Sequence, residues 1–306
     1  MTPAGKPQAR GATRQMTTNP FKPVPAIAAF AAGLLASGAA QAQNVGYPTP
    51  GQIGFQEAVT PIAHEIHYFH DVILMPIITI ISLFVLGLLA YVAWRFNEKA
   101  NPVASRTTHH AGLEVAWTVI PVMILVVIAI PSFRLLTHQL VMPQADVTVK
   151  VTGNQWYWSY EYPKDQGGGF GFDSNLKPDE EIKTAEGDLR LLSVDNEMVV
   201  PVDKEIRVQV TASNVLHSFV VQSFGIRMDA VPGRLSEMHF KAEKEGMYYG
   251  QCSKLCGQNH AYMPIAVRVV SAEKYAAWLG AAKKKFAFDG RSAISVAGID
   301  APAVSQ

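Results

Sequence analysis

The stretch MYYGQCSKLCGQNHAYMP (residues 247–264) contains both cysteines of this 306-residue chain. Its first five residues predict a β-strand, because aromatic side chains suit a pleated surface, and its final proline opens another apolar strand. The loop between these strands carries Cys252, Cys256, His260 and Met263. Thiolate, imidazole and thioether groups are the donors that soft copper prefers. The stretch therefore predicts two strands joined by a loop that holds copper.

A second histidine, His217, lies near one end of the apolar run 215–221, from where it can close the site from a separate strand. The donor set then contains two thiolates, two imidazoles and one thioether, which is too rich in sulfur for calcium or magnesium. The residues alone leave two alternatives open. One is zinc with two cysteines and two histidines. The other is a disulfide, which an oxidising compartment favours but which explains neither His260 nor Met263. By itself, Met263 is more often a core side chain than a ligand.

The region around this stretch, residues 146–270, is typical of a β-sandwich or a small Greek-key barrel. Its short segments alternate apolar and polar residues, and turns rich in glycine and proline separate them. Several short strands in 125 residues favour an all-β domain. We expect strands at residues 147–152, 189–194, 206–211, 215–221, 238–241, 247–251 and 265–270. A short amphipathic helix is expected at residues 272–286, followed by a flexible tail to residue 306.

Two apolar blocks, residues 72–94 and 115–136, precede the β-region, and each exceeds 20 residues. At about 1.5 Å per residue, either block is long enough to cross a hydrocarbon core of about 30 Å. A tryptophan stands near the loop end of each block, as is common at membrane interfaces. We therefore predict a transmembrane hairpin with helices at residues 71–95 and 115–137.

The connection between the two helices, residues 96–114, is expected on the cytoplasmic side. Between residues 95 and 113, three basic side chains, Arg95, Lys99 and Arg106, stand against Glu98 alone. An excess of Lys and Arg marks the cytoplasmic loops of membrane proteins. The charge pattern therefore predicts that both chain ends lie outside the cytoplasm.

A shorter apolar block, residues 24–36, is too short to span a bilayer. Basic residues precede it, and Ala-Gln-Ala follows at residues 40–42, with small residues at the alternate positions that a signal peptidase recognises. We predict a cleaved signal peptide over residues 1–42, with Met16 as an alternative start and an uncleaved anchor as the competing interpretation. An exported segment, residues 43–70, would then lead to the first helix, which agrees with the topology that the loop charge predicts.

The chain resembles subunit II of the haem–copper cytochrome c oxidases from about residue 54 to residue 275. This resemblance implies a two-helix transmembrane hairpin followed by an all-β cupredoxin-like Greek-key domain, residues 138–271. The predicted signal peptide and hairpin suit a bacterial inner membrane, with the β-domain in the periplasm. The matching motifs, in family order, are Gly54-Phe-Gln, His70-Asp71, the hairpin, Gln155-Trp-Tyr-Trp-Ser-Tyr-Glu161, Val194-Asp-Asn196, His217-Ser218, Asp229-Ala-Val-Pro-Gly-Arg234 and Tyr249-Gly-Gln-Cys252.

Members of that family hold a dinuclear copper centre, CuA, in the exported domain. By position, the resemblance implies that the two cysteines bridge both copper ions. His217 and Met263 would complete one copper, and His260 with the backbone carbonyl of Lys254 would complete the other. The implied role is to accept electrons from cytochrome c and to pass them to haem in subunit I. The complex then reduces oxygen and pumps protons.

The resemblance implies roles for two further residues. Trp156 matches the family's entry point for electrons; from the residues alone, Trp156 and Trp158 on one strand would be a core pair. Glu114 matches a carboxylate near the mouth of a proton pathway into subunit I. Its alternative is an interfacial carboxylate at a helix N-terminus, which the helix dipole favours.

Charge gives a third expectation. Residues 138–270 contain seventeen acidic and thirteen basic side chains, a net charge of −4. Charge complementarity with a basic cytochrome c would speed the encounter, and the acidic run at residues 179–188 is a candidate docking patch, or simply a solvated face. The whole chain has a net charge of +1 and no basic patch with interleaved aromatic residues, so nothing indicates a nucleic-acid partner.

The chain departs from the family pattern at Lys254, where the family usually carries glutamate. That glutamate helps to bind magnesium at the contact with subunit I, and an ammonium group cannot ligate a cation. We therefore expect the magnesium site to be weakened, formed by subunit I and water, or absent. The backbone carbonyl at this position can still reach copper.

Two other functions compete with the one that the resemblance implies. A quinol oxidase subunit II shares the fold and the hairpin but lacks the copper ligands, and all five ligand side chains are present here. A membrane-anchored copper-delivery protein would explain the donors but neither the aromatic run nor the hairpin. Oxygen reduction needs haem, and the sequence has no Cys-x-x-Cys-His attachment motif. Enzymatic activity is therefore assigned to the complex.

Overall fold

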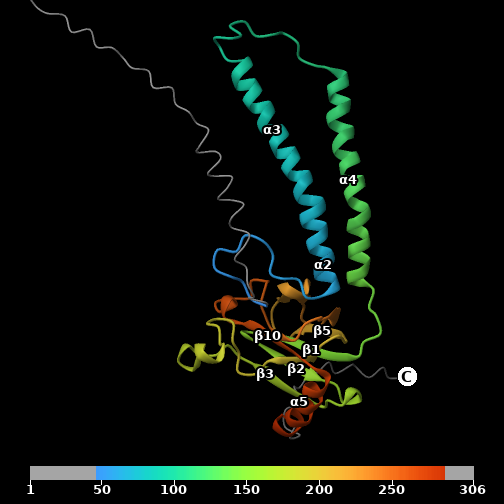
Figure 1. Ribbon diagram of the computed structural model, residues 1–306, viewed down its shortest axis with the longest axis vertical. Coiled ribbons are helices and arrows are strands. Elements are labelled where there is room, and N and C mark those ends of the chain that lie inside the picture. The colour runs from blue at the N-terminus through green and yellow to red at the C-terminus, as the bar shows by residue number, and fades with distance from the viewer. Residues whose placement is uncertain (1–45, 287–306) are drawn as a thin grey trace, which may run out of the picture. The chain divides into compact units, whose positions relative to one another are not determined.

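The computed structural model describes residues 46–286 (Figure 1). The predicted signal peptide with its cleavage site, the alternative start at Met16 and the predicted flexible tail lie outside the described residues.

Two long helical segments precede the β-domain (Figure 1). In the first, α2 (Pro61–Tyr68), a π-helical stretch (Phe69–Leu74) and α3 (Met75–Arg95) join into 35 continuous residues, and the second is α4 (Ala111–Leu140). Both are long and apolar enough to cross a membrane, and their apolar side chains are exposed within this chain. Such large apolar surfaces are stable only against lipid or another protein. The predicted hairpin is confirmed.

The first helix begins ten residues earlier than predicted, at Pro61 rather than at residue 71. Thr60 explains this start, because its hydroxyl accepts a hydrogen bond from Ala63 N at 3.0 Å and donates one to Phe224 O at 2.8 Å. Proline at the first helical position is compatible with a helix start, since it has no N–H to leave unpaired. The prediction counted only the apolar stretch and therefore missed these polar first turns.

The β-domain consists of two five-stranded sheets. The strand orders are β3-β2-β1-β5-β8 and β4-β10-β9-β6-β7. Most neighbours are antiparallel, but β1 pairs with β5 and β4 pairs with β10 in parallel, so both sheets are mixed, as in cupredoxin-like domains. The strands are β1 (Val147–Asn154), β2 (Tyr157–Tyr162), β3 (Phe170–Ser174), β4 (Met198–Pro201), β5 (Glu205–Ala212), β6 (His217–Val221), β7 (Ile226–Ala230), β8 (Ser236–Lys241), β9 (Gly246–Gln251) and β10 (Pro264–Val270).

The core lies between the sheets, where inward-facing residues from both meet. In β5, every second residue is buried, from Ile206 to Ala212, as the period of a strand with one buried face requires. Trp158 on β2 and Phe219 on β6 are fully buried and pack edge to face, with ring centroids 5.3 Å apart. This contact ties the two sheets together directly beside His217, the first residue of β6.

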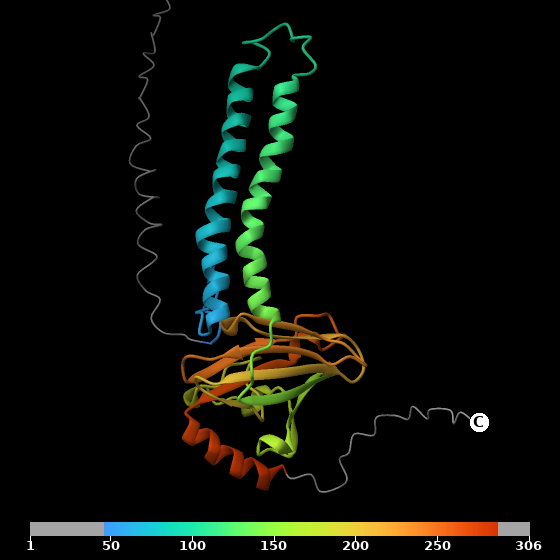
Figure 2. The same ribbon diagram turned by 90° about the vertical axis from the view of Figure 1, so that its right-hand side faces the viewer.

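The predicted C-terminal helix is confirmed as α5 (Ala272–Lys285), which lies against the β-domain (Figure 2). The Ser271 side chain caps its N-terminus by accepting a hydrogen bond from Lys274 N. Trp278 anchors the helix, because its ring packs against Tyr162 and Phe170 at centroid distances of 5.1 and 5.9 Å.

One predicted strand, residues 189–194, is wrong. Leu192 N and Ser193 N both donate hydrogen bonds to Leu189 O, so this segment is a turn, and Leu191 adopts a positive φ of 66°. Only Val194 pairs outward, in an isolated bridge to Leu176. Leu189 and Leu191 give the segment the apolar alternation of a strand, but the segment has no partner strand to pair with. Conversely, β3, β4 and β7 were not predicted, and β2 was anticipated only in the interpretation of Trp156 and Trp158 as residues of one strand.

Candidate metal centre

The ligand loop, residues 252–263, is held at both ends by one antiparallel strand pair. Gln251 at the end of β9 lies opposite Pro264 at the start of β10. The loop is also tied to β6, because Ser253 N donates to Ser218 O at 3.0 Å. These backbone bonds confirm the predicted arrangement of two strands joined by the loop, and they fix where its side chains point.

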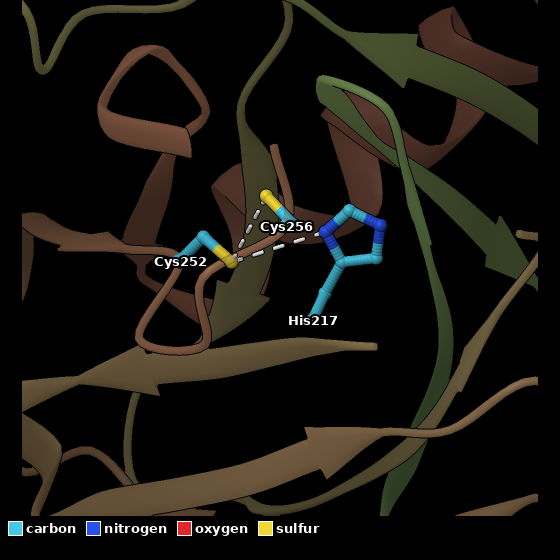
Figure 3. Close-up of side chains that lie close together, drawn as sticks. All are labelled: His217, Cys252 and Cys256. Atoms are coloured by element: carbon cyan, nitrogen blue, oxygen red, sulfur yellow. Dashed lines mark hydrogen bonds between the residues drawn. The ribbon is translucent and has the colours of Figure 1, made fainter. Parts of the chain in front are cut away.

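The two cysteine sulfurs lie at the centre of this loop (Figure 3). Cys252 Sγ and Cys256 Sγ are 4.0 Å apart, both thiols are free, and both side chains are about 5% exposed. His217 is fully buried and turns Nδ1 toward Cys252 Sγ at 3.8 Å. Three soft or borderline donors thus face one small volume, the arrangement required for a shared metal site.

The other predicted donors lie around the same two sulfurs. His260 Nδ1 and Met263 Sδ are each 3.5 Å from Cys256 Sγ, and the backbone carbonyl of Lys254 is 3.3 Å from Cys252 Sγ. Met263 is buried, and Trp158 Nε1 donates to its carbonyl at 3.3 Å. The structure therefore brings together all six predicted donor groups. Distances to the sulfurs do not assign donors to individual copper ions, so that pairing stays a prediction.

Burial controls the protonation of these groups. Desolvation, with the neighbouring Cys252 thiol, raises the pKa of Cys256 to about 12. Two adjacent thiolates are therefore unstable here unless a metal cation compensates their charge. Burial, with a smaller contribution from His260, lowers the pKa of His217 and favours the neutral imidazole, which is the form that ligates metals.

Lys254 belongs to the ligand loop, and its side chain forms an ion pair. Its ammonium Nζ is 3.3 Å from Asp229 Oδ2 on β7, and both side chains are about 40% exposed. The pair places a positive charge beside the Asp229 carboxylate, which also interacts with the Ser218 side chain. These residues do not fit a magnesium site.

Trp156 lies in the turn between β1 and β2, because β2 begins only at Tyr157. The interpretation of Trp156 and Trp158 as two residues on one strand is therefore wrong; Trp158 is core, whereas Trp156 is partly exposed. The Trp156 ring packs on the ligand loop, since a Cβ added at Gly257 would meet its Cζ2 at 3.0 Å. Trp156 thus contacts the residue that follows Cys256.

The structure does not bring Glu114 to the metal centre. This residue lies in the first turn of α4, where its Oε1 accepts a hydrogen bond from the backbone N–H of His110 at 3.2 Å. The bond satisfies one of the free N–H groups at a helix N-terminus and supports the capping interpretation. A role at the mouth of a proton pathway stays a prediction.

The acidic run at residues 179–188 is partly neutralised by its own neighbours. Asp188 pairs with Lys177 at 2.9 Å, Asp179 with Arg190 at 3.0 Å and Glu186 with Lys183 at 3.3 Å. Because these carboxylates are paired with basic side chains, the negative electrostatic potential of this surface is weaker than the run of acidic residues in the sequence suggests. These contacts favour a solvated face over a docking patch.

Two residues at the centre, Gln155 and Asn214, were given no role in the sequence analysis. The Gln155 side-chain amide donates to Cys256 O at 2.8 Å, and Asn214 Oδ1 lies 3.2 Å from His217 Nε2. Gln155 precedes Trp156 and Asn214 lies three residues before His217, but a polar residue in an exposed loop has no sequence pattern that predicts a contact with the site.

Comparisons with known proteins place this geometry in a family. Residues 147–270 match the model described as cytochrome c oxidase subunit II, periplasmic domain, and residues 48–135 match its transmembrane domain. The chain belongs to the cytochrome c oxidase subunit II family. This confirms the resemblance predicted from the motifs, and it identifies a membrane-anchored protein with a C-terminal soluble domain.

Two sequence relatives agree with the family assignment. Cytochrome c oxidase subunit 2 of Cereibacter sphaeroides is 49% identical over 271 residues, which are 83% of this chain and 89% of that protein. A probable cytochrome c oxidase subunit 2 of Rickettsia bellii is also 49% identical, over 80% of this chain and 89% of its own length. The crystal structure of the periplasmic domain of subunit II of cytochrome oxidase of Bradyrhizobium japonicum is 56% identical and has a TM-score of 0.44. It covers 48% of this chain and 100% of that domain.

Proposed function

We propose that this subunit II carries a dinuclear CuA centre, which accepts electrons from cytochrome c and passes them to haem in subunit I. One observation supports the proposal above all others. Two free, buried cysteine sulfurs lie 4.0 Å apart, and each has further donor atoms within 3.3 to 3.8 Å. A zinc site with two cysteines and two histidines would leave the Met263 thioether and the Lys254 carbonyl without a role.

The protein holds these donors rigidly. Cys252 follows β9, Met263 precedes β10, and His217 begins β6, so three hydrogen-bonded strands fix the ligands. When bound, a pair of copper ions held by Cys252, Cys256 and the donors around them would supply a one-electron relay. Strand-anchored ligands keep one arrangement in both oxidation states, and their burial keeps water away from the sulfurs. Both effects reduce the rearrangement that an electron transfer requires.

The rest of the chain supports a place in a larger oxidase. As a subunit II family member, it is part of an oxidoreductase complex with other subunits, and oxygen reduction belongs to those subunits. The apolar residues that line the groove between α3 and α4 need lipid or a partner helix to cover them. We further propose that the hairpin lies in a bacterial inner membrane, with the β-domain in the periplasm and the 96–110 connection in the cytoplasm.

The competing functions fit less well. A copper-free quinol oxidase subunit has no reason to cluster four further donor groups around two buried thiols. A copper-delivery protein must release its metal, whereas His217 lies on β6, the other donors lie on a loop held at both ends by β9 and β10, and most of these side chains are buried.

Electron paramagnetic resonance tests the copper proposal directly. We expect the purified full-length protein, loaded with copper and partly oxidised, to show hyperfine splitting from two equivalent copper nuclei. One unpaired electron shared through two thiolates produces that pattern. A spectrum of a single isolated copper, or a protein that retains only zinc, would overturn the proposed function.

Magnesium is expected to be absent from the Lys254 position. Metal analysis of the purified oxidase should find no magnesium that depends on this residue, because its ammonium already pairs with Asp229. In the Lys254→Glu variant the positive charge is lost and a carboxylate is added next to Asp229, so a tightly held divalent cation should appear. Stoichiometric magnesium in the unmodified oxidase, lost on substitution of Asp229, would contradict this expectation.

A further inference from the structure

Two side-chain amides, those of Gln155 and Asn214, connect the ligand loop to the back of the His217 ring. We propose that this amide bridge fixes the tautomer of His217, with the proton on Nε2 and the free electron pair of Nδ1 directed at the metal. The inference rests on the proposed copper centre and assigns positioning residues to it.

The first step is the orientation of the Asn214 amide. Its Oδ1 lies 2.7 Å from the backbone nitrogen of Val215, and a backbone N–H can only donate. The atom that faces Val215 is therefore the oxygen and not the nitrogen of the amide. The same oxygen lies 3.2 Å from His217 Nε2.

The histidine tautomer follows from that orientation. Because Asn214 Oδ1 is an acceptor, His217 Nε2 must carry the proton that it donates. The neutral ring has one proton, so Nδ1 is left with a free electron pair. Nδ1 faces Cys252 Sγ at 3.8 Å, on the side of the predicted copper ligands.

The hydrogen bonds of Gln155, at the other end of the bridge, independently require the same donor-to-acceptor direction. Gln155 Nε2 lies 2.8 Å from the carbonyl oxygen of Cys256, which can only accept a hydrogen bond. Gln155 Oε1 is therefore free to accept from Asn214 Nδ2 at 3.2 Å. A backbone donor at Val215 and a backbone acceptor at Cys256 thus orient both amides in one direction.

The link between the two side chains requires an amide at position 214, whereas the tautomer of His217 requires only its acceptor oxygen. An aspartate there could accept from Val215 N and from His217 Nε2, but it could not donate to Gln155. Asparagine performs both tasks and so links a metal-ligating histidine to the loop of a metal-ligating cysteine. Gln155 also precedes Trp156, so the same contact holds the turn that places this ring on Gly257.

Hydrogen bonds to the second nitrogen of a ligating histidine orient the ring and raise its basicity, and their removal typically lowers metal affinity about 10- to 100-fold. We therefore expect Asn214→Leu to speed copper loss to a chelator within that range in the full-length protein. The reduction potential of the copper centre in this variant should rise, because a less basic His217 stabilises the oxidised centre less. Asn214→Asp keeps the acceptor and should restore copper retention, with a potential at or below that of the unmodified protein.

Gln258→Leu is the matched control. Gln258 is an exposed amide on the same ligand loop, and its side chain makes no hydrogen bond within residues 46–286. Its removal should change neither copper retention nor potential. Asn214 is also exposed, so its substitutions leave the core intact.

The outcomes separate this inference from the proposed function. If the unmodified protein gives no dinuclear copper spectrum, the function itself fails. If that spectrum is present but Asn214→Leu behaves like Gln258→Leu, the amide bridge has no positioning role. Equal defects in Asn214→Leu and Asn214→Asp would also overturn the inference, since the aspartate retains the acceptor that the tautomer needs.

Discussion

Cys256→Ser is expected to abolish the dinuclear copper spectrum completely while the hairpin still inserts in the membrane. Cys256 Sγ is the sulfur closest to both His260 and Met263 and lies 4.0 Å from Cys252 Sγ. A serine hydroxyl is a hard, weakly acidic donor that cannot replace a bridging thiolate. Without the bridge, one electron can no longer be shared between two metals. Cys252→Ser should behave in the same way.

The measurement combines copper content, the paramagnetic spectrum and membrane fractionation of the full-length variants. Ser253→Ala is the matched control, because the described bond of Ser253 to β6 uses only its backbone N–H. Burying a serine hydroxyl in place of a thiol costs about 1–3 kcal/mol, so circular dichroism should verify that the β-domain is folded. A folded Cys256→Ser protein that keeps hyperfine splitting from two copper nuclei would exclude a bridging role for this residue.

The cluster of candidate donors could be predicted from the sequence because four of the five donor side chains fall in one short loop. Residues in one short loop between two paired strands lie close together in space, whatever the rest of the fold is. His217 required a further step, since it lies 35 residues before Cys252. Its place at the start of a strand made its contact with the loop predictable, because the ends of neighbouring strands meet.

Other features depend on contacts that no local pattern records. The segment from Leu189 to Ser193 alternates like a strand, yet it forms a turn because it has no partner strand. Trp156 lies one residue before β2, and only the three-dimensional path of the turn brings it to Gly257. The pairing of Lys254 with Asp229 joins residues that are 25 positions apart. Each of these is decided by tertiary packing.

Trp156→Leu is expected to slow electron entry from cytochrome c at least about tenfold, equivalent to about 1.4 kcal/mol in the barrier, while copper content stays near that of the unmodified protein. The Trp156 ring is partly exposed at the surface and contacts the ligand loop at Gly257, next to Cys256. It therefore offers a conjugated group between solvent and the predicted copper centre. Leucine retains apolar contact with the loop but has no conjugated system.

Stopped-flow reduction of the copper-loaded protein by cytochrome c measures this rate, and Trp278→Leu provides the control. Trp278 is likewise partly exposed and packs on Tyr162 and Phe170, in α5 rather than on the ligand loop. Loss of a tryptophan from the domain surface should cost stability in both variants. Only loss of the electron entry point should reduce the rate at full copper occupancy. Parallel decreases of rate and copper content in Trp156→Leu would instead assign this ring to the support of the ligand loop, because the slower reduction would then follow from missing metal.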